Sequence, residues 1–506
     1  MWAPRRNGAV RVSNGGMVCF RRPYCGSGDS IPTMSKNADL LLSRRTVLAG
    51  AAATTTFPWL FSAAHARSQR PNILFVSIDD LIDWAGVTGG HPQARTPHLD
   101  ALASRGRSFQ QAHCNAAICN PSRTAVLTGV APHVSGVYSN QAAWWTGVTG
   151  VPTLPALLKQ QGYTSIGAGK VFHFGDPTAW DRYMGDPCVK HHAEDRARPR
   201  KSDHVHVSEL GWGPARSSRP NIHPDEKVAA WVSGVLASKH KKPFFLACGF
   251  YKPHLPWIAP RKHFDALSID DVVVPEVPAN ELEDIPEMGR RMAHIEIHQK
   301  VMGRKAWKEA VRAYLAALAF ADAQLGRVIA ALEAGPHRDN TVVVVWSDHG
   351  WSLGEKFHWK KNALWEECTR VPLVFAGPGI RPGACERVVS LVDLYPTLAA
   401  MGGAPVHDRA AGHDLAPLLA DPQADWSHHC LTSHASGSHA VRTERWRYIR
   451  YADGTHELYD HHTDPGEHHN LADRPVHRPV IERLGALIPT SSAPPVRDVL
   501  QKCRPK

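Results

Sequence analysis

The sequence predicts an α/β fold in which helices cover both faces of a large mixed sheet, with a smaller antiparallel sheet near the C-terminus. Short, almost wholly apolar runs recur between segments with helical spacing, and such runs are typical of strands that are buried on both faces. They occupy residues 73–78, 164–168, 244–250 and 342–346. Beyond about residue 420 the runs become shorter and alternate apolar with polar residues, which is typical of a half-buried sheet.

Two helices are predicted between these strands. Residues 153–161 have helical spacing, with Pro155 in the first turn and Gly162 as the stop signal. Pro121 suits the first position of another helix, because its missing N–H costs nothing there, and Gly129 ends that helix.

Cys119 is expected just outside the N-terminus of the helix that begins near Pro121. Free backbone N–H groups and the positive end of the helix dipole favour an anion at such a position. A lone cysteine is more often a buried structural residue or half of a disulfide, since cysteine is among the most buried residue types. Here Cys119 is followed by Pro121, Ser122 and Arg123 and then by Leu-Thr-Gly at 127–129, which favours a catalytic role.

This run resembles the signature of the type I sulfatases, in which the cysteine is oxidised after translation to formylglycine. The resemblance implies that a maturation enzyme converts Cys119, and that the hydrated aldehyde rather than a thiolate is the nucleophile. It covers roughly residues 71–473 and implies an alkaline-phosphatase-like sheet between layers of helices. The runs at 169–173, 252–254 and 348–351 are similar to those of the iduronate-2-sulfatase branch.

Polar residues follow the ends of all four predicted central strands. In open α/β sheets, ligands bind at the carboxyl ends of the strands, so these residues are expected to share one site. In chain order they are Asp79 and Asp80, Lys170 and His173, His254, and Asp348 and His349.

The acidic residues at these strand ends indicate a metal site. Asp79, Asp80 and Asp348 supply carboxylate oxygens, which suit calcium or magnesium far better than zinc. An Asp-Asp pair at a strand end is also common as a turn or helix cap, which needs no metal. The resemblance implies one calcium ion per chain, bound by these three residues, by the formylglycine at Cys119 and by His349. The other cysteines have no C-x-x-C spacing, which argues against zinc.

The resemblance also assigns catalytic roles to five side chains. Arg123 and Lys170 stabilise the formylglycine diol. His173 is the candidate base that releases sulfate, and His254 protonates the alcohol that leaves. Lys361 contacts the sulfate, and the W-x-K spacing selects it over the preceding lysine. A single His or Lys is ordinarily a solvated surface residue, so these assignments depend on the matching motifs.

Composition and charge exclude few functions. The chain has 506 residues, of which 43% are hydrophobic and 21% charged, an ordinary globular composition. Its formal net charge is +11, but residues 1–66 contribute +6 of this through eight basic and two acidic side chains. The modest positive net charge of the remaining residues does not require a nucleic-acid partner. It suits a polyanionic substrate such as a sulfated polysaccharide, and equally the absence of any charged partner.

Residues 1–66 are predicted to be a leader with a twin-arginine export signal. Twin arginines at 44–45 precede a stretch of small and apolar residues at 49–64, and the run at 64–66 has the form of a signal-peptidase site. The alternative is a basic segment beside an ordinary buried helix. Threonines and Pro58 interrupt the apolar stretch, so no stable membrane anchor is expected. A periplasmic or secreted protein is therefore predicted.

The rest of the chain is expected to form a catalytic α/β domain, 67–420, and a small α+β subdomain, 421–506. In the subdomain, alternating runs at 439–442, 446–451 and 456–459 are the predicted strands of the antiparallel sheet.

Two irregular stretches, 191–225 and 268–303, are expected to be surface excursions that shape a substrate pocket. The complete pattern predicts a sulfatase that removes sulfate from a sulfated sugar, similar to an iduronate-2-sulfatase acting on glycosaminoglycan or other polysaccharide fragments. One alternative is a phosphomonoester or phosphonate hydrolase with the same fold. The other is a non-catalytic protein that binds sulfated glycans.

Overall fold

The predicted leader, 1–66, and part of the predicted excursion at 191–225 lie outside the residues that the structure describes. The described residues belong to a compact unit that begins at His65. In the computed structural model they are residues 70–186, 203–216, 223–499 and 503–504.

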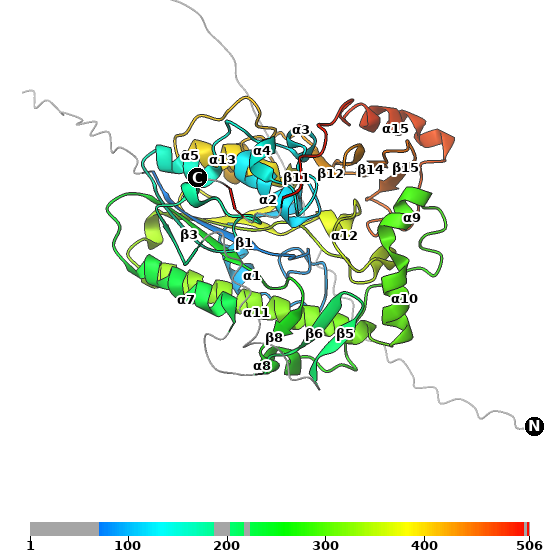
Figure 1. Ribbon diagram of the computed structural model, residues 1–506, viewed down its shortest axis with the longest axis horizontal. Coiled ribbons are helices and arrows are strands. Elements are labelled where there is room, and N and C mark those ends of the chain that lie inside the picture. Colours follow the sequence, from blue (N-terminus) through cyan, green and yellow to red (C-terminus); the bar gives the residue numbers. More distant parts are fainter. Residues whose placement is uncertain (1–69, 187–202, 217–222, 500–502, 505–506) are drawn as a thin grey trace, which may run out of the picture. The chain divides into compact units, whose positions relative to one another are not determined.

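Within the described residues, eight strands form one mixed sheet (Figure 1). The sheet is mixed because β10 (Leu373–Ala376) runs antiparallel to both of its neighbours. The four predicted apolar runs are adjacent strands in the centre of this sheet, so that prediction is confirmed. In spatial order the strands are β11 (Gly383–Ser390), β2 (Arg107–His113), β10, β9 (Thr341–Ser347), β1 (Asn72–Ile78), β7 (Phe244–Phe250), β3 (Thr164–Gly169) and β4 (Arg182–Tyr183).

The sheet is buried on both faces because successive residues of its central strands point to opposite sides. In β1, Leu74, Val76 and Ile78 belong to one apolar cluster. The intervening Ile73 and Phe75 belong to a second cluster. The two clusters are the two layers of the core.

Helices cover both of these layers (Figure 1). Helices α7 (Pro224–Ala237) and α11 (Trp307–Ala334) contribute to the first cluster. Helices α5 (Leu154–Gln160) and α13 (Leu394–Met401) contribute to the second. The other helices are α1 (Pro97–Ser104), α2 (Cys119–Thr128), α3 (Pro132–Ser135), α4 (Trp144–Gly147), α8 (Arg261–Asp265), α9 (Glu287–Ala293), α10 (Ile295–Gly303), α12 (Glu366–Thr369), α14 (Ala416–Ala420) and α15 (Arg478–Gly485).

Helix α11 is, among the described helices, the one that is long and apolar enough to cross a membrane by length and composition. However, 72% of its apolar window is buried inside the protein, where it packs against α7, α1 and β8 (Trp257–Ala259). Its apolar character is therefore explained by its place in the core.

Helix α2 begins earlier than predicted. Cys119 is its first residue rather than the residue outside it, and the extended residue before the helix is Ile118. The proline that follows two residues later is tolerated because the first N–H groups of a helix have no partner within it. Gly129 ends the helix as predicted, with φ of 71° and its N–H donating to the carbonyl of Ala125 (2.8 Å).

The predicted excursion at 268–303 contains more regular structure than expected, because α9 and α10 occupy its second half. The prolines of this stretch all precede these helices, whereas two of its glycines, Gly289 and Gly303, lie inside them. The last of these prolines, Pro286, is the residue directly before α9, a position that does not require a backbone N–H.

The described part of the 191–225 stretch is also regular. It forms a hairpin of β5 (Val205–Val207) and β6 (Leu210–Pro214), and β6 pairs in parallel with β8. Arg304, the residue after α10, donates a hydrogen bond to the carbonyl of His206 (2.9 Å). Helix α10 itself also packs against β5, so the two predicted excursions contact each other.

The small antiparallel sheet near the C-terminus is confirmed. Its four strands pair in chain order. The first of them was not predicted. The domain boundary between residues 420 and 421 stays a prediction. The strands are β12 (Cys430–His434), β13 (Ser438–Arg442), β14 (Trp446–Arg450) and β15 (His456–Asp460).

A buried ion network joins this small sheet to the α/β core. Arg447 of β14 is fully buried and pairs with Glu366 at the start of α12 and with Glu467 in the loop after β15. Arg442 of β13 also pairs with Glu366 (3.2 Å). Buried carboxylates need such partners, because an uncompensated buried charge is costly.

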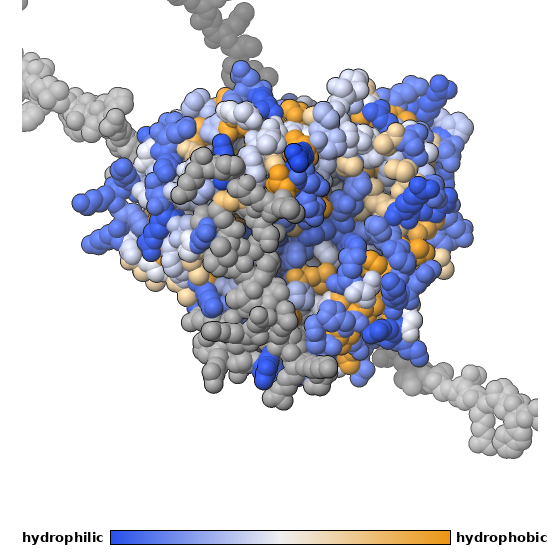
Figure 2. Space-filling model, viewed as in Figure 1, coloured by the Kyte–Doolittle hydropathy of each residue, from blue (hydrophilic) through white to orange (hydrophobic). Residues whose placement is uncertain are grey.

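The described surface on the face shown in Figure 2 is mainly hydrophilic, with apolar residues in small patches. The most exposed large hydrophobic side chain among the described residues is Val476, at 75%. Most of the apolar side chains are thus accounted for by the buried clusters.

Candidate active site

The carboxyl ends of four parallel strands form the floor of the site. In the sheet, β9, β1, β7 and β3 are consecutive neighbours. Ile78 of β1 is in register with Ser347 of β9, so the residues that follow them, Asp79 and Asp348, lie side by side. This confirms the expectation that the polar strand ends meet at one edge.

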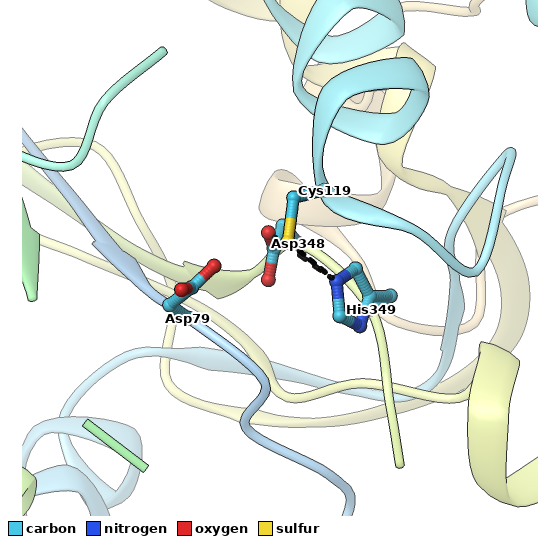
Figure 3. A group of neighbouring side chains, drawn as sticks. All are labelled: Asp79, Cys119, Asp348 and His349. Atoms are coloured by element: carbon cyan, nitrogen blue, oxygen red, sulfur yellow. Dashed lines mark hydrogen bonds and ion pairs between the residues drawn. The ribbon is translucent and has the colours of Figure 1, made fainter. Parts of the chain in front are cut away.

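Cys119 approaches this floor from the first turn of α2, and it is completely buried. Three nitrogen atoms surround its Sγ: Nζ of Lys361 at 3.1 Å, Nε2 of His349 at 3.3 Å and Nζ of Lys170 at 3.5 Å. Figure 3 shows Cys119 pointing toward Asp79, Asp348 and His349. The signature cysteine is therefore in the same site as the strand-end residues.

The electrostatic surroundings of Cys119 favour an anion. Burial alone raises the pKa of its thiol, but the ammonium groups of Lys170 and Lys361 lower it well below the ordinary value. The same two cations would stabilise any negative oxygen at this position.

Arg123, one turn further along α2, is buried and donates to two of the three acidic residues of the floor. Its Nε donates to Oδ2 of Asp348 (2.8 Å) and its Nη2 to Oδ1 of Asp79 (3.0 Å). Its Nη1 donates to the carbonyls of Lys170 (2.6 Å) and Val171 (3.0 Å). In this arrangement Arg123 orients the carboxylates, and its expected contact with the nucleophile stays a prediction.

The two adjacent lysines at 360–361 have different partners. Lys361 contacts Oδ1 of Asp80 (2.8 Å) as well as Cys119. Lys360 instead pairs with Glu209 in the turn of the β5–β6 hairpin (2.8 Å). The structure thus brings Lys361, the lysine chosen by spacing, to the site.

Lys170, the first residue after β3, also reaches the floor. Its Nζ pairs with Asp79 and lies within reach of Cys119, and the side chain is almost completely buried. Burial lowers the pKa of this ammonium, but Asp79 and Cys119 more than offset that effect and raise it. Lys170 is therefore a fixed positive charge.

His254 is on the loop after β7 and is the most accessible of the predicted histidines at the floor, with 29% of its side chain exposed. Its Nδ1 lies 2.6 Å from the carbonyl of Leu255, which directs Nε2 toward the carboxylates of Asp79 (4.0 Å) and Asp80 (3.9 Å). Burial lowers its pKa to about 4. His254 therefore directs Nε2 toward the carboxylates of the floor while its side chain stays partly exposed.

His173 lies in the loop after β3, partly buried, and its ring packs edge-to-face against Phe174 with centroids 5.0 Å apart. Its role as the base that releases sulfate stays a prediction.

The donor atoms of the site suit a hard cation. Asp79, Cys119, Asp348 and His349 each place one possible ligand atom within 4.8 Å of the others, and Asp79, Asp80, Cys119 and His254 form an overlapping group. Oδ2 of Asp80 is buried and has no hydrogen-bond partner among the described residues. A buried carboxylate oxygen without a partner is costly, and a calcium ion would satisfy it.

His349 is the one nitrogen ligand expected for this metal. Its Nδ1 lies 2.9 Å from the carbonyl of Gly350, so Nε2 faces Asp80 (3.4 Å) and Asp348 (3.6 Å). Burial lowers the pKa of His349, but Asp348 more than offsets burial and raises it to about 9. A cation at the site would compete with that proton for Nε2.

The sequence did not single out Asp225, which is buried in α7 close to the loop of His254. It accepts hydrogen bonds from the backbone N–H groups of Tyr251 and Lys252, both at 2.8 Å. Its position after Pro224 at a helix start looks like an ordinary cap, so only the tertiary fold reveals these partners.

Comparison with known proteins agrees with this site. The sulfatase family model matches residues 71–404, and the model for the C-terminal part of N-sulphoglucosamine sulphohydrolase matches residues 354–492. A sulfatase from Formosa agariphila is 33% identical over 450 residues, which cover 84% of this chain and 87% of the relative. The chain belongs to the sulfatase family.

More distant relatives have named substrates. Iduronate 2-sulfatase from Mus musculus is 28% identical over 399 residues, covering 69% of this chain and 72% of the relative. Delta 4,5-hexuronate-2-O-sulfatase from Bacteroides thetaiotaomicron is 28% identical over 454 residues, covering 85% and 90%.

Solved structures confirm the fold. The structure of BT4656 in complex with D-glucosamine-2-N,6-O-disulfate has a TM-score of 0.66 at 22% identity and covers 83% of this chain and 97% of its own. A phosphonate monoester hydrolase from Silicibacter pomeroyi has a TM-score of 0.70 at 21% identity, covering 82% and 94%. The predicted alkaline-phosphatase-like architecture is therefore correct.

Proposed function

We propose that this protein is a calcium-dependent sulfatase that removes sulfate from a sulfated sugar, with Cys119 converted to formylglycine. The observation that carries the proposal is the position of Cys119: its Sγ lies within 3.5 Å of Lys170, His349 and Lys361. Lys170 pairs with Asp79, Lys361 pairs with Asp80, and Nε2 of His349 lies 3.6 Å from Asp348. A nucleophile, cationic groups and a cation site are thus in one place.

The hydrate of formylglycine supplies one hydroxyl that attacks the ester sulfur and a second whose deprotonation expels sulfate and restores the aldehyde. Lys170 and Lys361 lie where they offset the negative charge on the transferring oxygens. Arg123 keeps the carboxylates of the floor in place. His173 is the proposed base for the second hydroxyl.

His254 is the proposed general acid. A proton on its Nε2 passes to the ester oxygen as the S–O bond breaks, so that the sugar leaves as an alcohol. Burial keeps the pKa of His254 low, at about 4. The negative charge of a bound sulfate ester favours the protonated imidazole and moves this pKa upward.

The metal would be held by Asp79, Asp80, Asp348 and His349, together with the modified side chain of residue 119. A calcium ion bound there would supply positive charge next to the sulfate group. Oδ2 of Asp80, which accepts no hydrogen bond from the described residues, supports this assignment.

The proposed substrate is a sulfated uronate in a glycosaminoglycan or similar polysaccharide fragment. The similarity to iduronate 2-sulfatase and to delta 4,5-hexuronate-2-O-sulfatase supports this class. A desulfation screen of defined oligosaccharides tests it, with 2-O-sulfated uronate expected among the best substrates. Release of sulfate only from non-uronate sugars would contradict the proposal.

Phosphonate or phosphate ester hydrolysis is the second candidate, because the phosphonate monoester hydrolase from Silicibacter pomeroyi shares this fold. We expect a higher kcat/KM for 4-nitrophenyl sulfate than for 4-nitrophenyl phosphate or phenylphosphonate esters, measured side by side. A preference for the phosphorus esters would replace the sulfatase assignment.

Conversion of Cys119 is tested by mass spectrometry of the peptide that contains it. In a host with the maturation enzyme, the peptide is expected to be lighter than the unmodified form by about 18 Da. Cys119→Ser is the control, with an unconverted residue and no sulfatase activity. Unconverted cysteine in such a host would favour the non-catalytic glycan-binding alternative.

We also propose that the protein is exported through the twin-arginine signal in residues 1–66. The signal motif at 44–45 supports this proposal. Cell fractionation is expected to find the protein outside the cytoplasm, and Arg44→Lys together with Arg45→Lys is expected to retain it inside. Export of the double variant at the wild-type level would contradict the proposed route.

A further inference from the structure

Asp225 ties helix α7 to the loop that carries His254. It is the second residue of α7 and has only 1% of its surface exposed. Oδ1 accepts the backbone N–H of Tyr251 and Oδ2 accepts that of Lys252, each at 2.8 Å. One carboxylate therefore fixes the first two residues after β7.

Those two residues in turn hold His254 from both sides. The backbone N–H of His254 donates to the carbonyl of Tyr251 (2.9 Å). Nζ of Lys252 donates to the carbonyls of His254 (3.0 Å) and Pro256 (2.6 Å). The backbone of the histidine is thus fixed through atoms that Asp225 orients.

We propose that Asp225 is a positioning residue that places Nε2 of His254 opposite the ester oxygen to be protonated. This inference rests on the proposed function, in which His254 is the general acid. Asp225 bonds to backbone amides two and three residues before the histidine, so it acts through the loop rather than on the substrate. A misplacement of about 1 Å at a reacting group can cost roughly 100-fold in rate.

Asp225→Asn tests the proposal because it keeps the size of the side chain and one acceptor oxygen. The other oxygen becomes an NH2 group that faces a backbone N–H, so the loop is expected to shift. The diagnostic readout is dependence on the leaving group, measured with phenyl sulfate and 4-nitrophenyl sulfate. Phenolate is a poor leaving group that needs a proton, whereas nitrophenolate is a much better one.

We expect kcat for phenyl sulfate to fall by about 10- to 100-fold in Asp225→Asn, with KM almost unchanged. For 4-nitrophenyl sulfate we expect a fall of less than about threefold. His254→Ala is expected to give the same selective loss, and adding Asp225→Asn to it is expected to cause little further loss. Equal losses on both esters, or full additivity, would overturn the positioning role.

Asp322→Asn is the matched control. Asp322 of α11 is also buried and accepts two backbone N–H groups, those of His98 (3.1 Å) and Leu99 (2.9 Å), but it holds the start of α1. Its variant is expected to change stability without changing the ratio of the two rates. The same change in ratio for Asp322→Asn would indicate a general structural effect and contradict the inference.

Two further measurements separate the possible failures. If Asp225→Asn does not fold, Lys252→Met is expected to show a weaker form of the same selectivity, and its absence would contradict the inference. If wild-type protein with a verified formylglycine releases sulfate neither from these two esters nor from any oligosaccharide of the desulfation screen, the proposed function has failed and the inference fails with it. If wild type is active and His254→Ala is selective but Asp225→Asn is not, only the inference has failed.

Discussion

Asp79 and Asp348 are joined by a single guanidinium, that of Arg123, which donates to one oxygen of each carboxylate at 3.0 and 2.8 Å. All three groups are buried. Burial raises the pKa of Asp348, and the positive charge of Arg123 opposes that rise. Ionisation of Asp348 therefore depends mainly on this arginine, whereas the pKa of Asp79 is lowered first by Lys170 and His254.

Arg123→Lys is expected to lower both activity and stability. A lysine ammonium is a point charge and cannot make the forked contacts to two carboxylates. We expect kcat/KM for an aryl sulfate to fall by about 100-fold or more. Urea unfolding is expected to show a loss of about 2–3 kcal/mol, the scale of a hydrogen bond to a charged group. Arg478→Lys, in an exposed pair with Glu482, is the control, and similar effects from both variants would contradict the role of Arg123.

Lys361→Met and Lys360→Met are expected to differ sharply. Lys361 contacts Asp80 and Cys119, whereas Lys360 contacts Glu209 near the surface. Loss of the Lys361 charge beside the transferring group is expected to lower kcat by about 100- to 1000-fold, and loss of Lys360 by less than about threefold. Steady-state kinetics with 4-nitrophenyl sulfate measures kcat for both variants and tests this difference. The reverse order would show that the spacing selected the wrong lysine.

Calcium is expected to stabilise the folded protein. A ligand that binds only the native state at about 100 times its Kd adds about 2.7 kcal/mol. The melting temperature should therefore rise on addition of calcium and fall again with a chelator. In Asp80→Asn, which alters the buried carboxylate with the unpartnered oxygen, most of this rise should vanish. A melting temperature that calcium does not change would count against the metal site.

Arg447→Met is expected to destabilise the attachment of the small sheet. The variant leaves Glu366 and Glu467 buried without their main partner. Removing one member of a buried ion pair costs about 3–5 kcal/mol. Arg445→Met, whose arginine is half exposed beside Asp460, should unfold close to the wild-type urea concentration. Equal midpoints for the two variants would mean that the buried network contributes little.

Asp393 is expected to make stability depend on pH. Burial raises the pKa of its carboxyl to about 7, although the backbone N–H groups of His413 and Ser390 lower it. The folded state therefore keeps a proton that the unfolded chain releases near pH 4, so this contribution to stability is lost as pH rises toward 7. Between pH 4.5 and pH 7.5, the free energy of unfolding in urea should fall less steeply for Asp393→Asn than for the wild type. The same slope in both proteins would contradict this role of Asp393.

Local patterns were sufficient for the centre of the fold. The strands at 73–78 and 342–346 are apolar on both faces, and the acidic residues after them can only meet if the strands are neighbours. The four strand ends and Cys119 were therefore predictable as one site. The start of α2 was missed because a helix can begin before a proline whose N–H is not needed.

Other features depend on tertiary contacts that leave no local signal. The β5–β6 hairpin lies in a segment rich in charge and histidine, and its pairing partner β8 is more than forty residues away. Helices α9 and α10 were missed because the prolines and glycines of their segment suggested irregular structure. Asp225 has an ordinary capping position, and its bonds to Tyr251 and Lys252 exist only once α7 packs beside β7.

The ion pair between Glu209 and Lys360 brings the turn of the β5–β6 hairpin next to Lys361, one of the residues assigned to the reaction. Most of the groups assigned to the chemistry follow the central strands or begin α2, whereas the hairpin is anchored through Arg304 and through β8, the strand that follows the loop of His254. We expect that replacing the hairpin with one of different length or charge changes which sulfated substrates the protein accepts. Engineering of selectivity in this protein should therefore begin at residues 205–214.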